Sequence, residues 1–142
     1  MLIEKGFGVL HLTRNPNAGT GEVKQYAWNV EKGTIDSAAL ENAHAIVHLA
    51  GAGIAAHRWT PHYRRQIIES RTQSAALLIQ ALQNNPAHKV EVFVGASAIG
   101  YYGNRNSQLL TETDAPQKGD FLSETTQLWE TAYAPLTDQL NI

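Results

Sequence analysis

The sequence contains no cysteine, which excludes disulfide bonds and thiolate metal sites. Neither sign of charge dominates, because 11 lysine and arginine residues are matched by 13 aspartate and glutamate residues. Such a balance gives no electrostatic basis for binding nucleic acid or a membrane, so we expect neither as a partner. No apolar run approaches the length of about 18 residues that a membrane-spanning helix needs. The first residues lack the basic start and apolar stretch of a signal peptide, so a cytoplasmic protein is expected.

A glycine-rich phosphate-binding loop is also missing ahead of the two segments where one would be expected. These segments, 47–53 and 94–103, each begin as an apolar β-branched run and stop at small residues. That pattern is typical of a parallel strand that is buried on both faces and opens onto a ligand crevice at its carboxyl end. No spacing among the acidic residues or histidines suggests a metal site.

Hydrophobic periodicity and turn residues predict alternating strands and helices along one domain of 142 residues. The strands are expected over residues 8–13, 23–29, 45–49 and 90–96, and the helices over residues 35–42, over 60–83 and from 123 onward. Strands that alternate with helices predict an α/β fold, in which a parallel sheet has flanking helices on both faces.

Local capping signals support three of these boundaries. Thr60 followed by Pro61 is typical of a helix start, and Ser123 is expected to cap the last helix. Pro135 is expected to kink or end that helix. Gly6 after residues 2–5 is typical of a helix that ends there.

Several short motifs occur in a fixed order and together cover nearly the whole chain. They are residues 46–51 (IVHLAG), 58–61 (RWTP), 70–71 (SR), 96–103 (ASAIGYYG), 111–112 (TE), 120–124 (DFLSE) and 129–130 (WE). In this order and spacing the chain resembles the atypical extended short-chain dehydrogenases/reductases, the NAD(P)-dependent sugar-nucleotide epimerase/dehydratase-like family.

The resemblance implies a Rossmann-like domain that is incomplete over residues 1–142. Members of the family open with a strand and a glycine-rich loop, and they end with a substrate-binding part; we expect both to be missing here. It also implies an oxidoreductase that uses a dinucleotide and acts on a sugar nucleotide or similar small molecule. A chain without the phosphate loop is expected to bind dinucleotide weakly and to be inactive alone.

The cofactor positions follow from the fold that the resemblance implies. Arg14 comes after the second strand, where an acid selects NAD and an arginine accommodates the 2′-phosphate of NADP. Because no acid is present there, NADP is favoured over NAD; the alternative is a solvated turn arginine. Leu49, Ala50 and Gly51 at one strand end, and Ala96 at the next, are expected to lie against the cofactor.

The resemblance implies an incomplete set of catalytic residues. By resemblance Ser97 is the hydroxyl that binds the substrate oxygen, or else a serine satisfied within a turn. The family's Tyr-x-x-x-Lys pair falls on Leu122 and Thr126, neither of which transfers a proton. Tyr101 and Tyr102 are the remaining phenols near Ser97, although no lysine lies close in sequence.

Two residues ahead of the long helix, Arg58 and Trp59, are candidates for the rim of the substrate site, where they could meet a phosphate or a base. The alternative is that Trp59 packs on the core as a helix staple.

Two further functions stay open: a non-catalytic nucleotide sensor or scaffold of the same fold, and a flavodoxin-like or receiver module. Small residues such as Ala50 and Ala96 at the strand ends count against a receiver, which needs aspartates there. Without its first strand the sheet is expected to have a gap with two open edges, which favours self-association or strand exchange.

Overall fold

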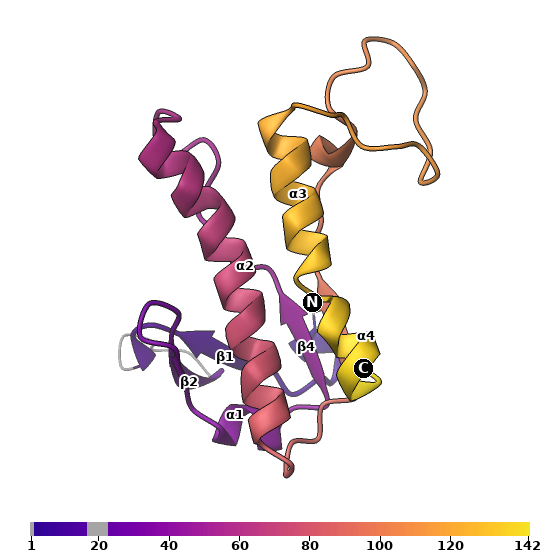
Figure 1. Ribbon diagram of the computed structural model, residues 1–142. Helices are drawn as coiled ribbons and strands as arrows, with labels where there is room; N and C mark the ends of the chain where they lie inside the picture. Colours follow the sequence, from indigo (N-terminus) through magenta and orange to yellow (C-terminus); the bar gives the residue numbers. More distant parts are fainter. Residues whose placement is uncertain (1, 17–22) are drawn as a thin grey trace.

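The computed structural model describes residues 2–16 and 23–142, and its elements alternate along the chain much as the sequence predicts (Figure 1). Their bounds are η1 Ile3–Lys5, β1 Leu10–Thr13, β2 Lys24–Asn29, β3 Thr34–Ile35, α1 Ala38–Glu41, β4 Ala45–His48, α2 Pro61–Asn84, β5 Val92–Gly95, η3 Ile99–Tyr102, α3 Phe121–Thr131 and α4 Ala134–Leu140. No helix in this part of the chain is long and apolar enough to cross a membrane.

The strands form two separate small sheets rather than one continuous sheet. β1 pairs in parallel with β2, which pairs in antiparallel fashion with the short strand β3. β4 pairs in parallel with β5. The expected parallel pairs are therefore present, whereas the single parallel sheet is not, and β3 adds an antiparallel edge that the sequence analysis did not predict.

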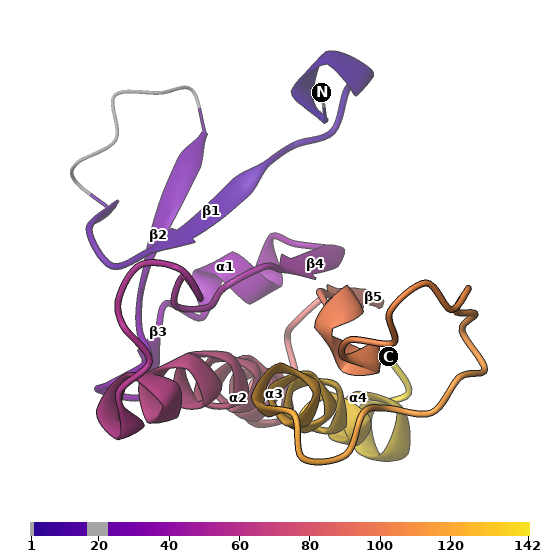
Figure 2. The ribbon, with the colours of Figure 1, turned by 90° about the horizontal axis from the view of Figure 1, so that it is seen from above.

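The strands β4 and β5 are buried on one face only, which corrects the expectation of burial on both. Ile46 and His48 are buried, while Val47, Val92 and Val94 have exposed fractions of 56%, 51% and 51%. Figure 2 shows the reason: the long helices α2, α3 and α4 all lie on the same side of these strands. The other side is an open apolar face, defined here by Val47, Val92 and Val94.

The long helix α2 begins where its sequence predicts. The Thr60 hydroxyl accepts a hydrogen bond of 3.2 Å from the Tyr63 amide, and Pro61 occupies the first turn, where its missing N–H costs nothing. Its buried residues recur with helical spacing, as expected. They are Tyr63, Ile67, Ser74, Ala75, Leu77, Leu78, Ile79 and Leu82.

The cap of α3 differs from the prediction. Asp120, not Ser123, is the capping residue, and its carboxylate accepts a hydrogen bond of 2.9 Å from the Ser123 amide. Ser123 is fully buried in the first turn, and its hydroxyl donates to the Tyr101 carbonyl at 2.6 Å. The helix ends at Thr131, and Pro135 lies in the first turn of the separate helix α4.

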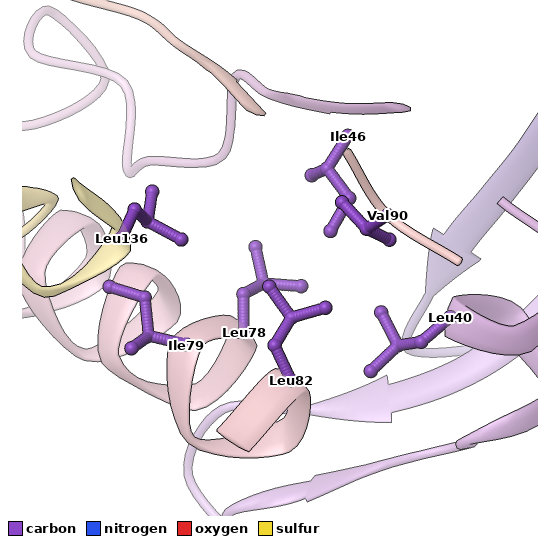
Figure 3. Packing of buried hydrophobic residues seen from close by; sticks show 7 residues of the cluster. All are labelled: Leu40, Ile46, Leu78, Ile79, Leu82, Val90 and Leu136. Carbon is purple, nitrogen blue, oxygen red and sulfur yellow. The ribbon is translucent and has the colours of Figure 1, made fainter. Parts of the chain in front are cut away.

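The hydrophobic core lies where α2 packs against α1, β4 and α4 (Figure 3). Its members are Leu40, Ile46, Leu78, Ile79, Leu82, Val90 and Leu136. At the other end of the chain η1 is a short turn that ends at Gly6, whose φ of +82° suits glycine, so the predicted end of a helix at this position is confirmed.

Candidate functional site

A pocket of about 490 Å³ lies at the carboxyl ends of β1, β2 and β4, against one side of α2. It brings together Arg14, Ala50 and Gly51, three of the residues that the sequence analysis assigned to the cofactor. Residues at and after the end of β2, residues after β4 and side chains of α2 complete the lining: Trp28, Asn29, Val30, Glu31, Ala52, Gln66, Glu69, Ser70, Gln73 and Ser74. We call this cavity the strand-end pocket.

The strand-end pocket is polar and of mixed charge. Among the described residues that line it, Arg14 is the single cationic side chain, and Glu31 and Glu69 bring two carboxylates. Amides at Asn29, Gln66 and Gln73 can both donate and accept hydrogen bonds. This donor set suits a ligand that carries hydroxyls and an aromatic base edge, with one position for a phosphate at the guanidinium.

Helix α2 holds the chain that leaves β4 in a fixed conformation. The Ser70 hydroxyl accepts from the Ala52 amide at 2.8 Å, and Arg71 donates to the Ala52 carbonyl at 3.1 Å. A side chain at Gly51 would meet Arg71, with a Cβ 2.9 Å from the guanidinium carbon. The Tyr63 hydroxyl donates to the Gly53 carbonyl at 2.5 Å, so the small residues here allow close packing on α2.

Leu49 and Ala96 do not line the strand-end pocket. Leu49 has an exposed fraction of 72% and lines a second, larger cavity. The Ala96 amide donates to the His48 carbonyl at 3.1 Å, which extends the pairing of β5 with β4 by one residue.

Ser97, at the end of β5, has a partner that the sequence analysis did not consider. Its hydroxyl donates to a carboxylate oxygen of Glu130, which lies 33 residues later in α3. Both side chains are exposed, so a ligand can reach the pair. The motif Trp129-Glu130 was visible in the sequence, but its proximity to Ser97 depends on how α3 packs beside β5.

Tyr101 and Tyr102 lie in η3 and contact each other edge to face, with ring centroids 5.1 Å apart. In the described part of the chain no hydrogen bond joins either phenol to Ser97. Their backbone carbonyls instead accept from Ser123 and Arg105, which anchors η3 to α3 and to the following loop.

Trp59 and Arg58 lie in the loop between β4 and α2. The Trp59 indole donates to the Ile54 carbonyl at 2.7 Å and packs on Phe121 at 5.2 Å between ring centroids. The guanidinium of Arg64 lies over both rings. Trp59 thus connects this loop to the start of α3, and the Arg58 side chain is exposed beside it.

A buried polar cluster lies behind the strand ends. The Tyr133 hydroxyl and the Ser74 hydroxyl lie 2.8 and 2.9 Å from the two ring nitrogens of His48. Ser74 donates to carbonyls of its own helix, so it accepts from His48 Nε2, and Tyr133 donates to Nδ1. Burial lowers the pKa of His48 to about 4 and raises the pKa of Tyr133 to about 12.

Leu122 and Thr126, onto which the resemblance places the Tyr-x-x-x-Lys pair, both have structural contacts. Leu122 packs against Gly100, and the buried Thr126 hydroxyl donates to the Leu122 carbonyl at 2.8 Å. Within residues 2–16 and 23–142, no group of three or more His, Cys, Asp or Glu side chains could hold a metal ion.

Comparison with curated proteins finds several epimerase family proteins. One from Mycobacterium tuberculosis is 34% identical over 127 residues, which is 89% of this chain and 40% of that protein. One from Bacillus subtilis is 31% identical over 130 residues, 92% of this chain and 42% of that protein. The chain therefore spans about two fifths of the length of these relatives. No protein-family model matches it.

Comparison with solved structures supports the fold. A human epimerase family protein solved with NADPH aligns with a TM-score of 0.70 at 21% identity, covering 93% of this chain and 42% of that one. A UDP-glucuronic acid 4-epimerase variant from Bacillus cereus, in complex with NAD, aligns with a TM-score of 0.74 at 15% identity, covering 99% of this chain and 48% of that one. The chain has the α/β fold of part of these proteins.

Proposed function

Because this chain belongs to the epimerase family over the span that it shares with its relatives, we propose that it forms the dinucleotide-binding part of an epimerase- or dehydratase-like oxidoreductase. The substrate is a sugar nucleotide or a similar small carbinol. The strand-end pocket is the observation that carries this proposal, since it gathers Arg14, Ala50 and Gly51 at the carboxyl ends of parallel strands.

The lining of this pocket fits the adenosine end of a dinucleotide. Small residues at Ala50, Gly51 and Ala52 leave room for a sugar against the backbone. Carboxylates at Glu31 and Glu69 can accept hydrogen bonds from ribose hydroxyls, and Arg14 can pair with a phosphate. A human relative by fold is known with NADPH and others with NAD, so both dinucleotides suit this fold.

When bound, the nicotinamide would accept the hydride, and the residues of this chain orient the substrate. Tyr101 or Tyr102 is the proposed acceptor of the substrate's hydroxyl proton. Ser97 is the group that meets the substrate hydroxyl. Its own proton is directed to Glu130, so its oxygen is free to accept a hydrogen bond from the substrate. In this proposal Ala96 and Leu49 lie along the cofactor, and Arg58 and Trp59 lie at the substrate rim.

A second candidate function is a nucleotide sensor or scaffold without catalysis. Leu122 and Thr126 favour it, because Leu122 lacks a titratable group and the Thr126 hydroxyl is already used within its helix. The two functions share the pocket and differ only in chemistry at Ser97.

Titration of the purified chain with NADPH and NADH, followed by nucleotide fluorescence, tests the shared part of the proposal. We expect weak saturable binding with a preference for NADPH. Arg14→Ala is expected to weaken NADPH binding about tenfold or more by removing a charge-assisted hydrogen bond, with a smaller effect on NADH. Arg65→Ala is the matched control, because this exposed arginine on α2 does not line the pocket.

The outcomes separate the proposals. Equal weakening by both substitutions, or no binding to either dinucleotide by a folded chain, contradicts the cofactor assignment. If the chain binds NADP⁺, a rise in absorbance at the NADPH band on incubation with UDP-glucose supports the oxidoreductase over the sensor.

A further inference from the structure

Cationic side chains gather around the start of helix α2. Residues 57–65 read HRWTPHYRR, so three arginines and two histidines stand among nine residues. All five side chains are exposed: His57, Arg58, His62, Arg64 and Arg65. The whole chain carries a formal net charge of -2, so this concentration of positive charge is local.

The position of these charges opposes the electrostatics of the helix. The amino-terminal end of a helix carries a partial positive charge, which favours acidic residues in the first turn and disfavours cations. The first turn of α2 contains no acidic residue. The first turn of α3 carries Glu124, but within residues 2–16 and 23–142 no carboxylate forms an ion pair with Arg58 or Arg64. The protein itself therefore leaves this positive charge without a partner.

Two aromatic rings hold the Arg64 guanidinium in place. Its carbon lies 5.8 Å from the ring centroid of Trp59 and 5.1 Å from that of Phe121. A guanidinium that stacks on aromatic rings keeps the N–H donors at its edge available, and these donors match the oxygens of a phosphate. Among the described residues they have no acceptor, whereas Arg71 and Arg105 donate to backbone carbonyls.

The aromatic rings around this guanidinium are themselves fixed. The Trp59 indole N–H donates to the Ile54 carbonyl at 2.7 Å, and the Trp59 ring centroid lies 5.2 Å from that of Phe121. Phe121 is the first residue of α3, and Figure 1 shows that α2 and α3 begin at the same end of the molecule. The His57 ring packs edge to face on Tyr63, at 4.9 Å between centroids. A ligand bound here meets groups that are already positioned, which lowers the entropic cost of binding.

The size and charge of the cluster favour a small ligand. Arg58 and Arg64 flank Trp59 in the sequence, and Trp59 keeps an exposed fraction of 37%, so a ligand can reach the stack. Guanidinium groups bind phosphate oxygens through paired hydrogen bonds. The net charge of -2 opposes binding of an extended polyanion such as a nucleic acid.

We propose that Arg58 and Arg64 form a binding site for the phosphate group of a small anionic molecule, beside Trp59. His57 supplies a further hydrogen-bond donor at the edge of this site. The site is independent of the proposed dinucleotide site, because none of these residues lines the strand-end pocket. The phosphate belongs either to a nucleotide or to a free inorganic anion, and both present the same oxygens.

Titration of this chain with inorganic pyrophosphate tests the proposal, with binding followed by the Trp59 indole N–H resonance in NMR spectra and by calorimetry. We expect a saturable shift of this resonance. Arg64→Ala should weaken binding at least about tenfold, because charge-assisted hydrogen bonds are lost. Arg65→Ala is the matched control, since it removes the same charge one residue away without a ring contact. It should change affinity less than about threefold.

A second variant keeps the test independent of the aromatic packing. Arg58→Ala removes a cation that stacks on neither ring, and it should also weaken binding at least about tenfold. Circular dichroism shows whether each variant keeps its fold; if Arg64→Ala does not, Arg58→Ala and the shift in the unaltered chain decide. Arg14→Ala should leave the Trp59 shift unchanged, which separates this site from the strand-end pocket.

UDP-glucose and glucose distinguish the two sources of the phosphate. If UDP-glucose shifts the Trp59 resonance and pyrophosphate competes with it, the site takes the phosphate of a nucleotide. If pyrophosphate alone shifts it, the site takes a free anion. Glucose should have no effect, because it carries no phosphate.

Three results overturn the proposal. The first is a Trp59 resonance that shows no saturable shift with either phosphate compound. The second is a shift with UDP-glucose that pyrophosphate neither reproduces nor competes for, which would assign recognition to the base or the sugar. The third is equal weakening by Arg64→Ala and Arg65→Ala, which would attribute binding to positive charge in general.

Discussion

His48 connects elements that are distant in the sequence. It follows the buried Ile46 at the end of β4, accepts a hydrogen bond from Tyr133 after α3, and donates to Ser74 in α2. A neutral imidazole satisfies both partners, because one ring nitrogen accepts and the other donates. Protonation would leave Tyr133 facing a second donor, so both burial and hydrogen bonding favour the neutral form.

Stability is therefore expected to fall as the pH is lowered. The native pKa of His48 is about 4 and its ordinary value is 6.5, so between these values the unfolded chain binds more protons. The contribution is fully present above the unfolded pKa and lost as the pH falls toward 4. At about 1.36 kcal/mol per pKa unit, the difference between 6.5 and about 4 corresponds to at most about 3.4 kcal/mol.

Urea unfolding at pH 7 and pH 4.5 tests this prediction, with His48→Gln as the comparison because glutamine does not titrate. The unaltered chain should lose more unfolding free energy between the two pH values than the variant does. Equal losses would show that other groups cause the acid sensitivity.

At this scale the sequence identified single residues better than their partners. Arg14, Ala50 and Gly51 were predicted from their positions after strands, and they line one pocket because parallel strands end at the same edge; their cofactor role stays a prediction. Glu130 beside Ser97 and Tyr133 beside His48 were not, since each pair spans more than 30 residues. Only the packing of α3 on the sheet brings these partners together.

The helix starts show when local sequence signals predict the capping residue and when they do not. Thr60 with Pro61 was recognised because cap and first turn are adjacent in sequence. Asp120 and Ser123 are both good capping types, three residues apart, and the choice between them depends on the Tyr101 carbonyl, which accepts from the Ser123 hydroxyl. A tertiary contact thus determines which residue caps α3.

Asp120→Ala is expected to destabilise the chain by about 1 kcal/mol, because the Ser123 amide loses its acceptor. Asp120→Asn is the matched control, since asparagine caps about as well as aspartate. Thermal unfolding of both variants measures the difference. Similar losses in the two would attribute the effect to the negative charge near the helix start rather than to the cap.

Across the whole molecule every strand except β3 was predictable from the sequence, whereas the burial of the strands was not. Apolar β-branched runs gave β4 and β5 nearly correct bounds, yet burial on both faces requires a layer on each side. Helices cover one side only, and the open apolar face remains on the other. The gap between the sheets, in contrast, agrees with the break expected next to β1 and β4.

The open apolar face predicts self-association at high protein concentration. Val94→Thr, which keeps the side-chain shape and adds a hydroxyl, should lower the association measured by sedimentation velocity and change stability by less than about 1 kcal/mol. Leu109→Ser is the control, because Leu109 is 93% exposed on a loop away from these strands. A monomer at all concentrations, or equal effects of both variants, contradicts this expectation.

Helix α2 contributes lining residues to both cavities. Leu78 lines the cavity of about 750 Å³ between β1 and β4, and Ser74, one turn earlier, lines the strand-end pocket. A helix rises only about 6 Å over four residues. Leu78 and Ser74 are therefore neighbours on one helix, so a substitution that shifts α2 at either residue is expected to change the shape of both cavities.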